Sequence, residues 1–266
     1  MNGSLAQIIC LVSHGNSYLN GGTVDLSKNT TFQHVSRIEF ARYKNNKAKH
    51  GKVIARNVSD WFTFLRSLNV TRLWTIAFDW QNEAIPEHVA DHFANYVQRA
   101  IQADLPNGFE LWYPKWSTVG HGKSAGWRVE YRSLMFSDSQ ALPVQKMSLV
   151  KSFLKKAVSQ AESFAKRSDV NENNWATWFT KSLELLDSSA PTVPYHNDVL
   201  PASGYSLEAR QILASATQAH VFGGMGSWNE LGFEKPEIHQ EYERVSKELY
   251  SAIKYATLMA SNSFGL

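Results

Sequence analysis

A change in the pattern of apolar residues near residue 140 divides this 266-residue sequence into two unlike halves. Before it, short apolar segments alternate with polar turns, as β-strands do. After it, each long segment repeats its apolar residues every three or four positions, which is typical of amphipathic helices. The switch falls at residues 137–143. We therefore expect an α+β fold, with a strand-rich half in residues 1–140 and a mostly helical half in residues 141–266 packed against it, or one continuous domain.

Five segments of the first half predict strands of a mainly antiparallel sheet, because they are short, apolar and bounded by turn residues. They are residues 5–12, 35–43, 73–78, 109–116 and 127–136. Two other segments predict helices. In residues 58–68, Trp61 and Leu65 recur at helical spacing, with Asn57 or Ser59 as the candidate cap. Residues 86–101 begin with a proline and repeat apolar residues every four positions.

Four helices are expected in the second half. They span residues 144–165, 173–186, 207–219 and 238–260. The last has the most regular pattern, a single apolar stripe made by Ile238, Tyr242, Val245, Leu249, Ile253 and Ala256. Residues 188–204 contain several prolines and predict a loop between the second and third of these helices.

Composition excludes some classes of protein. Hydrophobic residues make up 43% of the chain and charged residues only 19%, which favours a large core and disagrees with disorder. The net charge of +3 is small for a dedicated nucleic-acid binder. The one basic cluster consists of Arg42, Lys44, Lys47, Lys49, His50, Lys52 and Arg56. A hydrated loop over residues 44–52 is the simpler interpretation; as a binding site, the cluster suits an acidic protein and RNA equally.

The sequence also predicts a cytoplasmic protein that does not enter the membrane. A single cysteine, Cys10, cannot form an internal disulfide, and its apolar surroundings indicate a small core residue. The apolar run around it is too short for a secretory signal, and no segment approaches the roughly twenty apolar residues that span a bilayer.

Motifs for common catalytic chemistries are incomplete. Residues 120–124 read GHGKS, but a phosphate-binding loop also needs a glycine where Ser117 stands and a helix directly after Ser124, so a β-hairpin turn explains them better. Residues 224–228 miss the Gly-x-Ser-x-Gly elbow of α/β-hydrolases. His88 and His92 lack the HExxH pattern of zinc enzymes. We expect no metal and no cofactor.

Residues 220–233, HVFGGMGSWNELGF, are the most distinctive stretch. Four glycines in so short a segment indicate positive φ angles or a close backbone approach. Trp228 here and Trp80 after a predicted strand are the tryptophans outside predicted core faces, and each either anchors a partner or fills the seam between the two halves of its own protein. The candidate binding residues are Trp228, Asn229, Gly224, Gly226 and Trp80. We expect an ordered loop that packs on the first half, with Trp228 more than half buried.

The segments VFGGMGSWN at 221–229, QEYE at 240–243, VSHGNSYL at 12–19 and WRVE at 127–130 resemble uncharacterised bacterial proteins. The resemblance brings no established activity with it. In size and in their lack of a catalytic motif, such proteins are similar to the immunity or accessory proteins encoded beside bacterial toxins. The resemblance thus implies a protein partner, by association and not by mechanism.

Two classes of function remain open. The preferred one is a non-catalytic protein that binds another protein, such as an immunity-type neutraliser of a toxin. The alternative is a hydrolase-like enzyme with a site between the two halves. Its candidate residues are His14, His121, His220, Asp79 and Glu230. Converging histidines and carboxylates with shifted pKa values would favour the enzyme, and an apolar surface patch would favour the binding protein.

Overall fold

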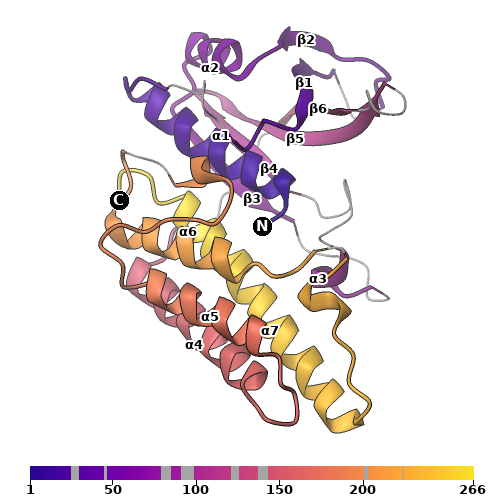
Figure 1. Cartoon of the computed structure of the whole chain (residues 1–266). Helices are drawn as coiled ribbons and strands as arrows, with labels where there is room; N and C mark the ends of the chain where they lie inside the picture. The colour runs from indigo at the N-terminus through magenta and orange to yellow at the C-terminus, as the bar shows by residue number, and fades with distance from the viewer. Residues whose placement is uncertain are drawn as a thin grey trace.

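The computed structural model describes residues 1–24, 30–44, 47–78, 85–90, 99–120, 126–136, 143–200, 203–223 and 225–266. A six-stranded mixed sheet is built from the first half of the chain, and four long helices from the second half form a bundle beside it (Figure 1). The α+β class expected from the sequence is therefore confirmed.

The sheet is mainly antiparallel, as predicted. Its strands are β1 (Val35–Arg42), β2 (Lys52–Ala55), β3 (Arg72–Ala77), β4 (Arg99–Leu105), β5 (Gly108–Val119) and β6 (Gly126–Phe136). Their order across the sheet is β2-β1-β6-β5-β4-β3. The neighbours β1 and β6 run parallel, and each of the other described neighbours is antiparallel.

Helices make up the rest of the described architecture. They are α1 (Gly3–Leu19), α2 (Val58–Ser67), α3 (Glu87–Ala90), α4 (Met147–Ala165), α5 (Asn173–Leu185), α6 (Leu207–Ala219) and α7 (Pro236–Ser261), with 3-10 turns η2 (Asn197–Val199) and η3 (Trp228–Glu230). The helices predicted at 58–68 and in the second half are confirmed with small shifts at their ends. Asn57 caps α2 as expected, because its Oδ1 accepts a hydrogen bond from the Asp60 backbone at 2.8 Å.

The predicted strand over residues 5–12 is wrong, because these residues lie in α1. The two main cores of the protein meet on this helix: Leu5 and Ile9 pack into the core of the helical half, and Ile8 packs into the core beneath the sheet. A helix buried on all sides reads as a continuous apolar run, which is also the pattern of a buried strand. The overlooked signal is Asn2, whose Oδ1 accepts a hydrogen bond from Leu5 N at 2.9 Å and caps the helix.

The predicted helix over residues 86–101 is also wrong. Helical structure is limited to α3 in the described part of this segment, and β4 has already begun at Arg99, while residues 91–98 lie outside the described residues. Ile101, which fitted the four-residue spacing, lies opposite Trp112 of β5. Residues 99–103 are all buried, so β4 lacks the alternation that marks a half-exposed strand.

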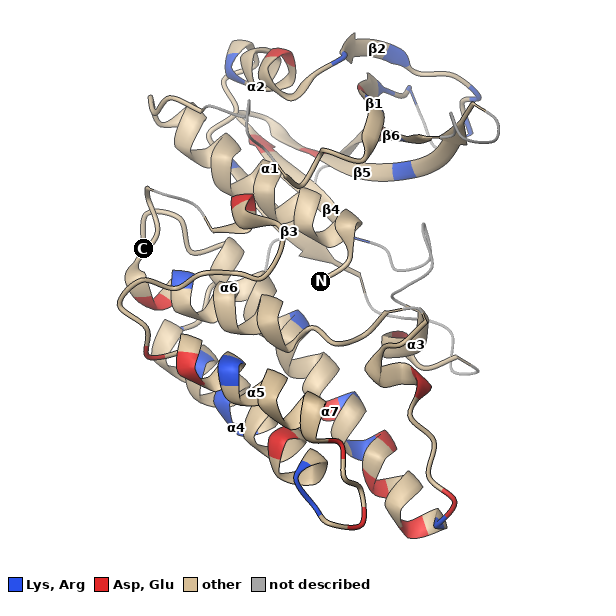
Figure 2. Cartoon of the chain, in the orientation of Figure 1, with Lys and Arg blue, Asp and Glu red and all other residues tan. Residues whose placement is uncertain are grey.

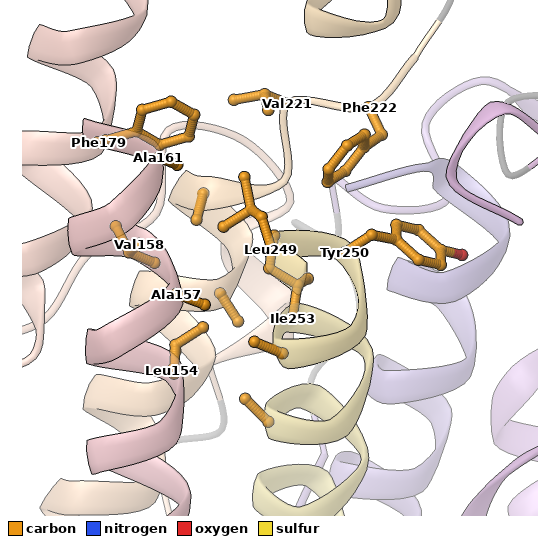
Figure 3. Packing of buried hydrophobic residues seen from close by; sticks show 14 of the residues in the cluster. Leu154, Ala157, Val158, Ala161, Phe179, Val221, Phe222, Leu249, Tyr250 and Ile253 are labelled. Carbon is orange, nitrogen blue, oxygen red and sulfur yellow. The ribbon is translucent and has the colours of Figure 1, made fainter. Parts of the chain in front are cut away.

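The helix α7 lies at the centre of the helical core. The stripe predicted from its sequence is buried from Ile238 to Ala256, and Leu249 is fully buried. Leu249 and Ile253 face Leu154 and other apolar side chains of α4 (Figure 3). One turn of α7 also presents Tyr250 toward the segment that follows α6, and this contact leads to the candidate site.

Candidate functional site

The segment after α6, residues 221–231, is a folded loop that we call the glycine loop; its Gly224 lies outside the described residues. The Trp228 backbone N–H donates to the Val221 carbonyl at 3.2 Å, and Ser227 Oγ donates to the Gly223 carbonyl at 3.0 Å. Gly226 has a φ of 77°, which confirms the positive φ predicted for this segment. The amide of Asn229 donates to the His88 carbonyl at 3.1 Å, so the loop also contacts the first half of the chain.

Trp228 holds the glycine loop onto the helical core. Its side chain is fully buried, its indole N–H donates to Ser246 Oγ at 2.7 Å, and its backbone carbonyl accepts a bond from the Tyr242 hydroxyl at 2.6 Å. The ring lies against Phe164, Trp175, Phe179 and Tyr242. Trp228 is therefore buried as predicted, but inside the helical half and not at the expected seam between the two halves, and it is not presented to a partner in this structure.

An open pocket of about 620 Å³, which we call the seam pocket, lies beside the glycine loop. Its lining comes from Met1 and Asn2 ahead of α1, from the start of α5, from Tyr195 and His220, and from the glycine loop. Its aromatic side chains are Trp175, Trp178, Tyr195 and Phe222. Met225 also lines the pocket, and 98% of its surface is exposed. Apolar, aromatic-lined hollows with an exposed apolar residue beside them are typical of binding surfaces.

Several polar groups of the seam pocket are already bonded within the chain. Burial raises the pKa of Tyr195 to about 12, so its hydroxyl stays neutral, and this hydroxyl accepts a hydrogen bond from the Met1 nitrogen at 2.5 Å. The Trp178 indole donates to the Gln218 carbonyl. His220 packs edge-on against Phe222, with ring centroids 5.9 Å apart. The described lining residues include no Asp or Glu, so they bring no general acid or base carboxylate to His220.

The structure disperses the described members of the predicted enzyme site. His14 donates from Nε2 to the Asp198 carbonyl at 3.0 Å and does not line the seam pocket. The carboxylate of Glu230 accepts a bond from the Gly226 backbone at 2.5 Å and stabilises the glycine loop. Of the predicted residues, His220 and Gly226 line the pocket. Asp79, Trp80, His121 and Gly224 lie outside the described residues, and so their part in any site stays a prediction.

The GHGKS segment connects two antiparallel strands. Val119 pairs with Gly126 at the end of β5 and β6, which agrees with the predicted hairpin, although residues 121–125 lie outside the described part. Because β6 begins at Gly126, no helix follows Ser124 as a phosphate-binding loop requires. Residues 122–126 read GKSAG and match the letters of a hydrolase elbow, but that elbow joins a strand to a helix.

Sequence reasoning missed the aromatic residues that shape the pocket. Trp175 and Trp178 were assigned to the core by their helical spacing, and both are only partly buried. Trp127 was assigned to the core as well, and 43% of its surface is exposed. The available signal for the pocket was Met225, an apolar residue flanked by glycines in a loop, where no core can cover it.

Among the residues described, no group of three or more His, Cys, Asp and Glu side chains is placed to hold a metal ion. Within the same residues, no helix has the length and apolar character needed to cross a membrane. Comparison of the chain with protein-family models, with curated proteins and with solved structures gives no match.

Proposed function

We propose that this chain is a non-catalytic protein that binds another protein, and that the seam pocket is its binding site. One observation carries the proposal: an open hollow lined by four aromatic side chains lies beside Met225, which is almost completely exposed. Aromatic residues and methionine are enriched in the centres of protein interfaces, where a side chain of the partner fills a pocket.

The construction of the pocket supports binding more than catalysis. Its walls are fixed by buried contacts, since Trp175 lies against Trp228 and Phe222 lies against Tyr250, with ring centroids 6.0 and 5.2 Å apart. A pre-formed hollow loses little conformational freedom when an apolar side chain enters it. The lining described above supplies mostly aromatic and apolar surface and no carboxylate, which suits an apolar or aromatic side chain of a partner.

To find a partner, a C-terminally tagged chain is used to capture proteins from an extract of its source organism. The affinity of each purified candidate is then measured by calorimetry for the parent chain and for variants of two exposed methionines. We expect Met225→Ser to weaken binding at least tenfold, because an apolar contact next to the pocket is lost. Met135→Ser is the matched control, since Met135 of β6 is also exposed and lies outside the pocket lining, and it should change the affinity less than twofold. Equal affinities for both variants would contradict the proposal.

We also propose a more specific role for the chain within this class of binding proteins. The resemblance of the glycine loop and of the chain's opening to bacterial proteins supports a bacterial, immunity-type protein that neutralises a toxin. The lone Cys10, buried in α1, agrees with a cytoplasmic setting. Under this assignment, the captured partner is a toxin whose activity falls when the chain is added in equimolar amount, and Met225→Ser protects less well.

A further inference from the structure

A second surface lies on the sheet, away from the seam pocket. The segment from β1 to the residue after β2, positions 35–56, contains the basic cluster noted in the sequence and one acidic residue, Glu39. Lys and Arg mark β2, β5 and the loop after β1 in Figure 2. We use the name arginine face for the surface formed by β1, β5, β6 and the residue after β2. It carries Arg37, Arg56, Lys115, Arg128 and Arg132.

The strand registers place these side chains together. Glu39 and Glu130 are paired residues of β1 and β6, and Lys115 of β5 is paired with Glu130 from the other side. Paired residues on neighbouring strands project from the same face of a sheet. Arg128 and Arg132 lie two residues either side of Glu130 and share its face. The opposite face bears Phe40 and Tyr131, which pack in the core with residues of α1 and α2.

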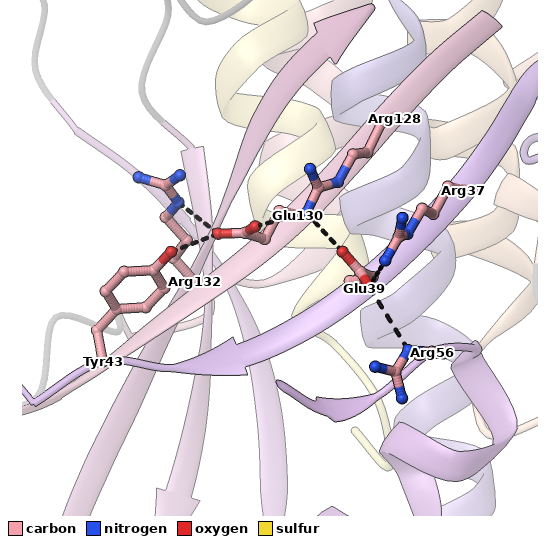
Figure 4. A network of polar contacts seen from close by, with 7 residues as sticks. All are labelled: Arg37, Glu39, Tyr43, Arg56, Arg128, Glu130 and Arg132. Carbon is pink, nitrogen blue, oxygen red and sulfur yellow. Dashed lines mark hydrogen bonds and ion pairs between the residues drawn. The ribbon is translucent and has the colours of Figure 1, made fainter. Parts of the chain in front are cut away.

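The carboxylates lie beneath the guanidinium groups. Glu39 has 1% of its side chain exposed and accepts bonds from Arg37 at 2.5 Å and Arg128 at 2.6 Å, with Arg56 3.7 Å away (Figure 4). Glu130 accepts bonds from Arg132 at 2.8 Å, from Tyr43 at 2.6 Å and from Arg128 at 3.1 Å. In contrast, Arg37 and Arg56 have 54% and 72% of their side chains exposed.

This layering leaves positive charge on the surface. Each guanidinium has five N–H donors, and the ion pairs of Arg37 and Arg56 with Glu39 use a small part of them. Because both side chains are more than half exposed, a ligand can reach them, and a guanidinium offers its donors in a fork that matches a carboxylate. The buried glutamates fix the arginine side chains in place, so a ligand has less side-chain freedom to remove.

We propose that the arginine face binds an acidic segment or surface of a protein, through ion pairs with the exposed guanidinium groups and Lys115. An acidic ligand complements the charge of this face, because four arginines and a lysine surround two glutamates that are already paired with arginines. The site goes beyond the binding function proposed for the seam pocket and does not depend on it.

A nucleic acid fits the same face less well. Single-stranded nucleic acids bind to basic grooves that also offer aromatic rings for stacking. The Tyr43 ring on this face lies under Arg132, whose guanidinium carbon is 5.1 Å from the ring centroid, and its hydroxyl is bonded to Glu130. The exposed Trp127 pairs with Thr118 and stacks edge-on with Trp116, whose indole bonds to Ser4 of α1 on the opposite face.

The test uses a fluorescently labelled decaglutamate peptide and measures its anisotropy as the full chain is added at about 50 mM salt. We expect saturable binding that is lost by about 300 mM salt, where exposed charges are screened within a few ångströms. Arg56→Gln combined with Lys115→Gln should weaken binding about tenfold. The matched control, Lys235→Gln combined with Lys247→Gln, removes two exposed charges from the region of α7 and should change binding less than twofold.

A second pair of variants distinguishes a loss of binding from a loss of folding. Lys44→Gln with Lys49→Gln removes exposed charge from the adjoining loop without touching the pairs of Glu39, and it should also weaken binding, by about threefold. Each variant is first shown to unfold at the same urea concentration as the parent. The proposal is overturned if decaglutamate does not bind, if the control pair weakens binding as much, or if labelled oligothymidine or duplex DNA binds more tightly. A dimer that the arginine variants dissociate would assign the face to a second copy and would overturn it too.

Discussion

Asn262 pairs with Thr75 as a neighbouring β-strand would. Its Oδ1 accepts a bond from the Thr75 N–H at 2.7 Å, and its Nδ2 donates to the Thr75 carbonyl at 2.9 Å. Two residues earlier on β3, Asn16 of α1 bonds in the same way to both backbone groups of Leu73, at 2.8 and 2.9 Å. An open strand edge is a site for unwanted pairing with other chains. Here two side chains, from α1 and from the end of α7, close part of the β3 edge.

Asn262→Ala should therefore cost about 2–4 kcal/mol of unfolding free energy, because it leaves a buried N–H and a buried carbonyl without partners. Asn262→Asp keeps the acceptor for the Thr75 N–H but places a negative charge against the Thr75 carbonyl. The variant should therefore regain part of the lost unfolding free energy at low pH, where the protonated acid can donate a hydrogen bond to this carbonyl. Urea unfolding at pH 7 and pH 4 measures both effects. Gln240→Ala, on the exposed side of α7, is the control and should stay within about 0.5 kcal/mol of the parent.

Glu39 should make stability depend on pH. Burial acts to raise the pKa of its carboxyl, but hydrogen bonds from Arg37 and Arg128 outweigh burial and hold the pKa below its ordinary value of 4.5. A carboxyl with a lowered folded-state pKa stabilises the protein above its unfolded-state pKa, and this contribution is lost as the pH falls through the folded-state pKa. Glu39→Gln should thus cost about 1–3 kcal/mol at pH 7 and much less at pH 3.

The measurement is the urea midpoint of parent and variant at both pH values. Glu237→Gln, at the exposed start of α7, is a suitable control and should change stability little at either pH. If Glu39→Gln costs as much at pH 3 as at pH 7, the charge of Glu39 does not contribute to stability.

Leu249→Ala tests the centre of the helical core. Leu249 is fully buried within the main cluster of apolar residues, and truncation of such a leucine leaves a cavity that costs about 2–5 kcal/mol. Lys247→Ala, two residues earlier and exposed, should be nearly neutral. A Leu249→Ala chain as stable as the parent in urea would mean that α7 is not part of the core in solution.

Three helices of the second half, α4, α5 and α7, could be predicted because each has an exposed face along part of its length, whereas α6 shows little of this contrast, since it is buried from Gln211 to Ala219. Ile238 and Leu249 recur at helical spacing with exposed residues such as Gln240 and Lys247 between them, and this contrast is what the hydrophobic period reports. In α1 the contrast disappears, since both of its faces meet a core. In β4 the alternation disappears for the same reason, and burial from Arg99 to Ala103 hides the strand.

The seam pocket was beyond sequence reasoning for a different reason. Its walls come from Met1 and Asn2 ahead of α1, from Trp175 and Trp178 of α5, from Tyr195 and from the glycine loop, and no local pattern records that these segments meet. Sequence pattern identified the glycine loop because glycine density is a local property. It could not show whether Trp228 points outward or inward, since both arrangements use the same residues.

Two glycines of α1 give the most discriminating test of how this helix is packed. Alanine exceeds glycine in helix propensity by about 1 kcal/mol, so Gly→Ala in an open helical position is stabilising. Gly3 is exposed, and a methyl group there would meet nothing within 4 Å, so Gly3→Ala should be neutral or raise the unfolding free energy by up to about 1 kcal/mol. At Gly15 a methyl group would overlap the δ-methyl of Leu73 and lie 2.9 Å from Cε1 of Phe62.

Overpacking of this kind costs about 1–3 kcal/mol, and the neighbours of Gly15 have little freedom to move. Leu73 is fully buried on β3, where Asn16 holds its backbone, and the Phe62 ring is buried in the core beneath the sheet. We therefore expect packing to outweigh propensity, with a net loss of about 1–2 kcal/mol for Gly15→Ala in urea unfolding. If Gly15→Ala stabilises the chain as Gly3→Ala does, α1 does not approach β3 and α2 this closely, and the junction between the two cores is looser than described here.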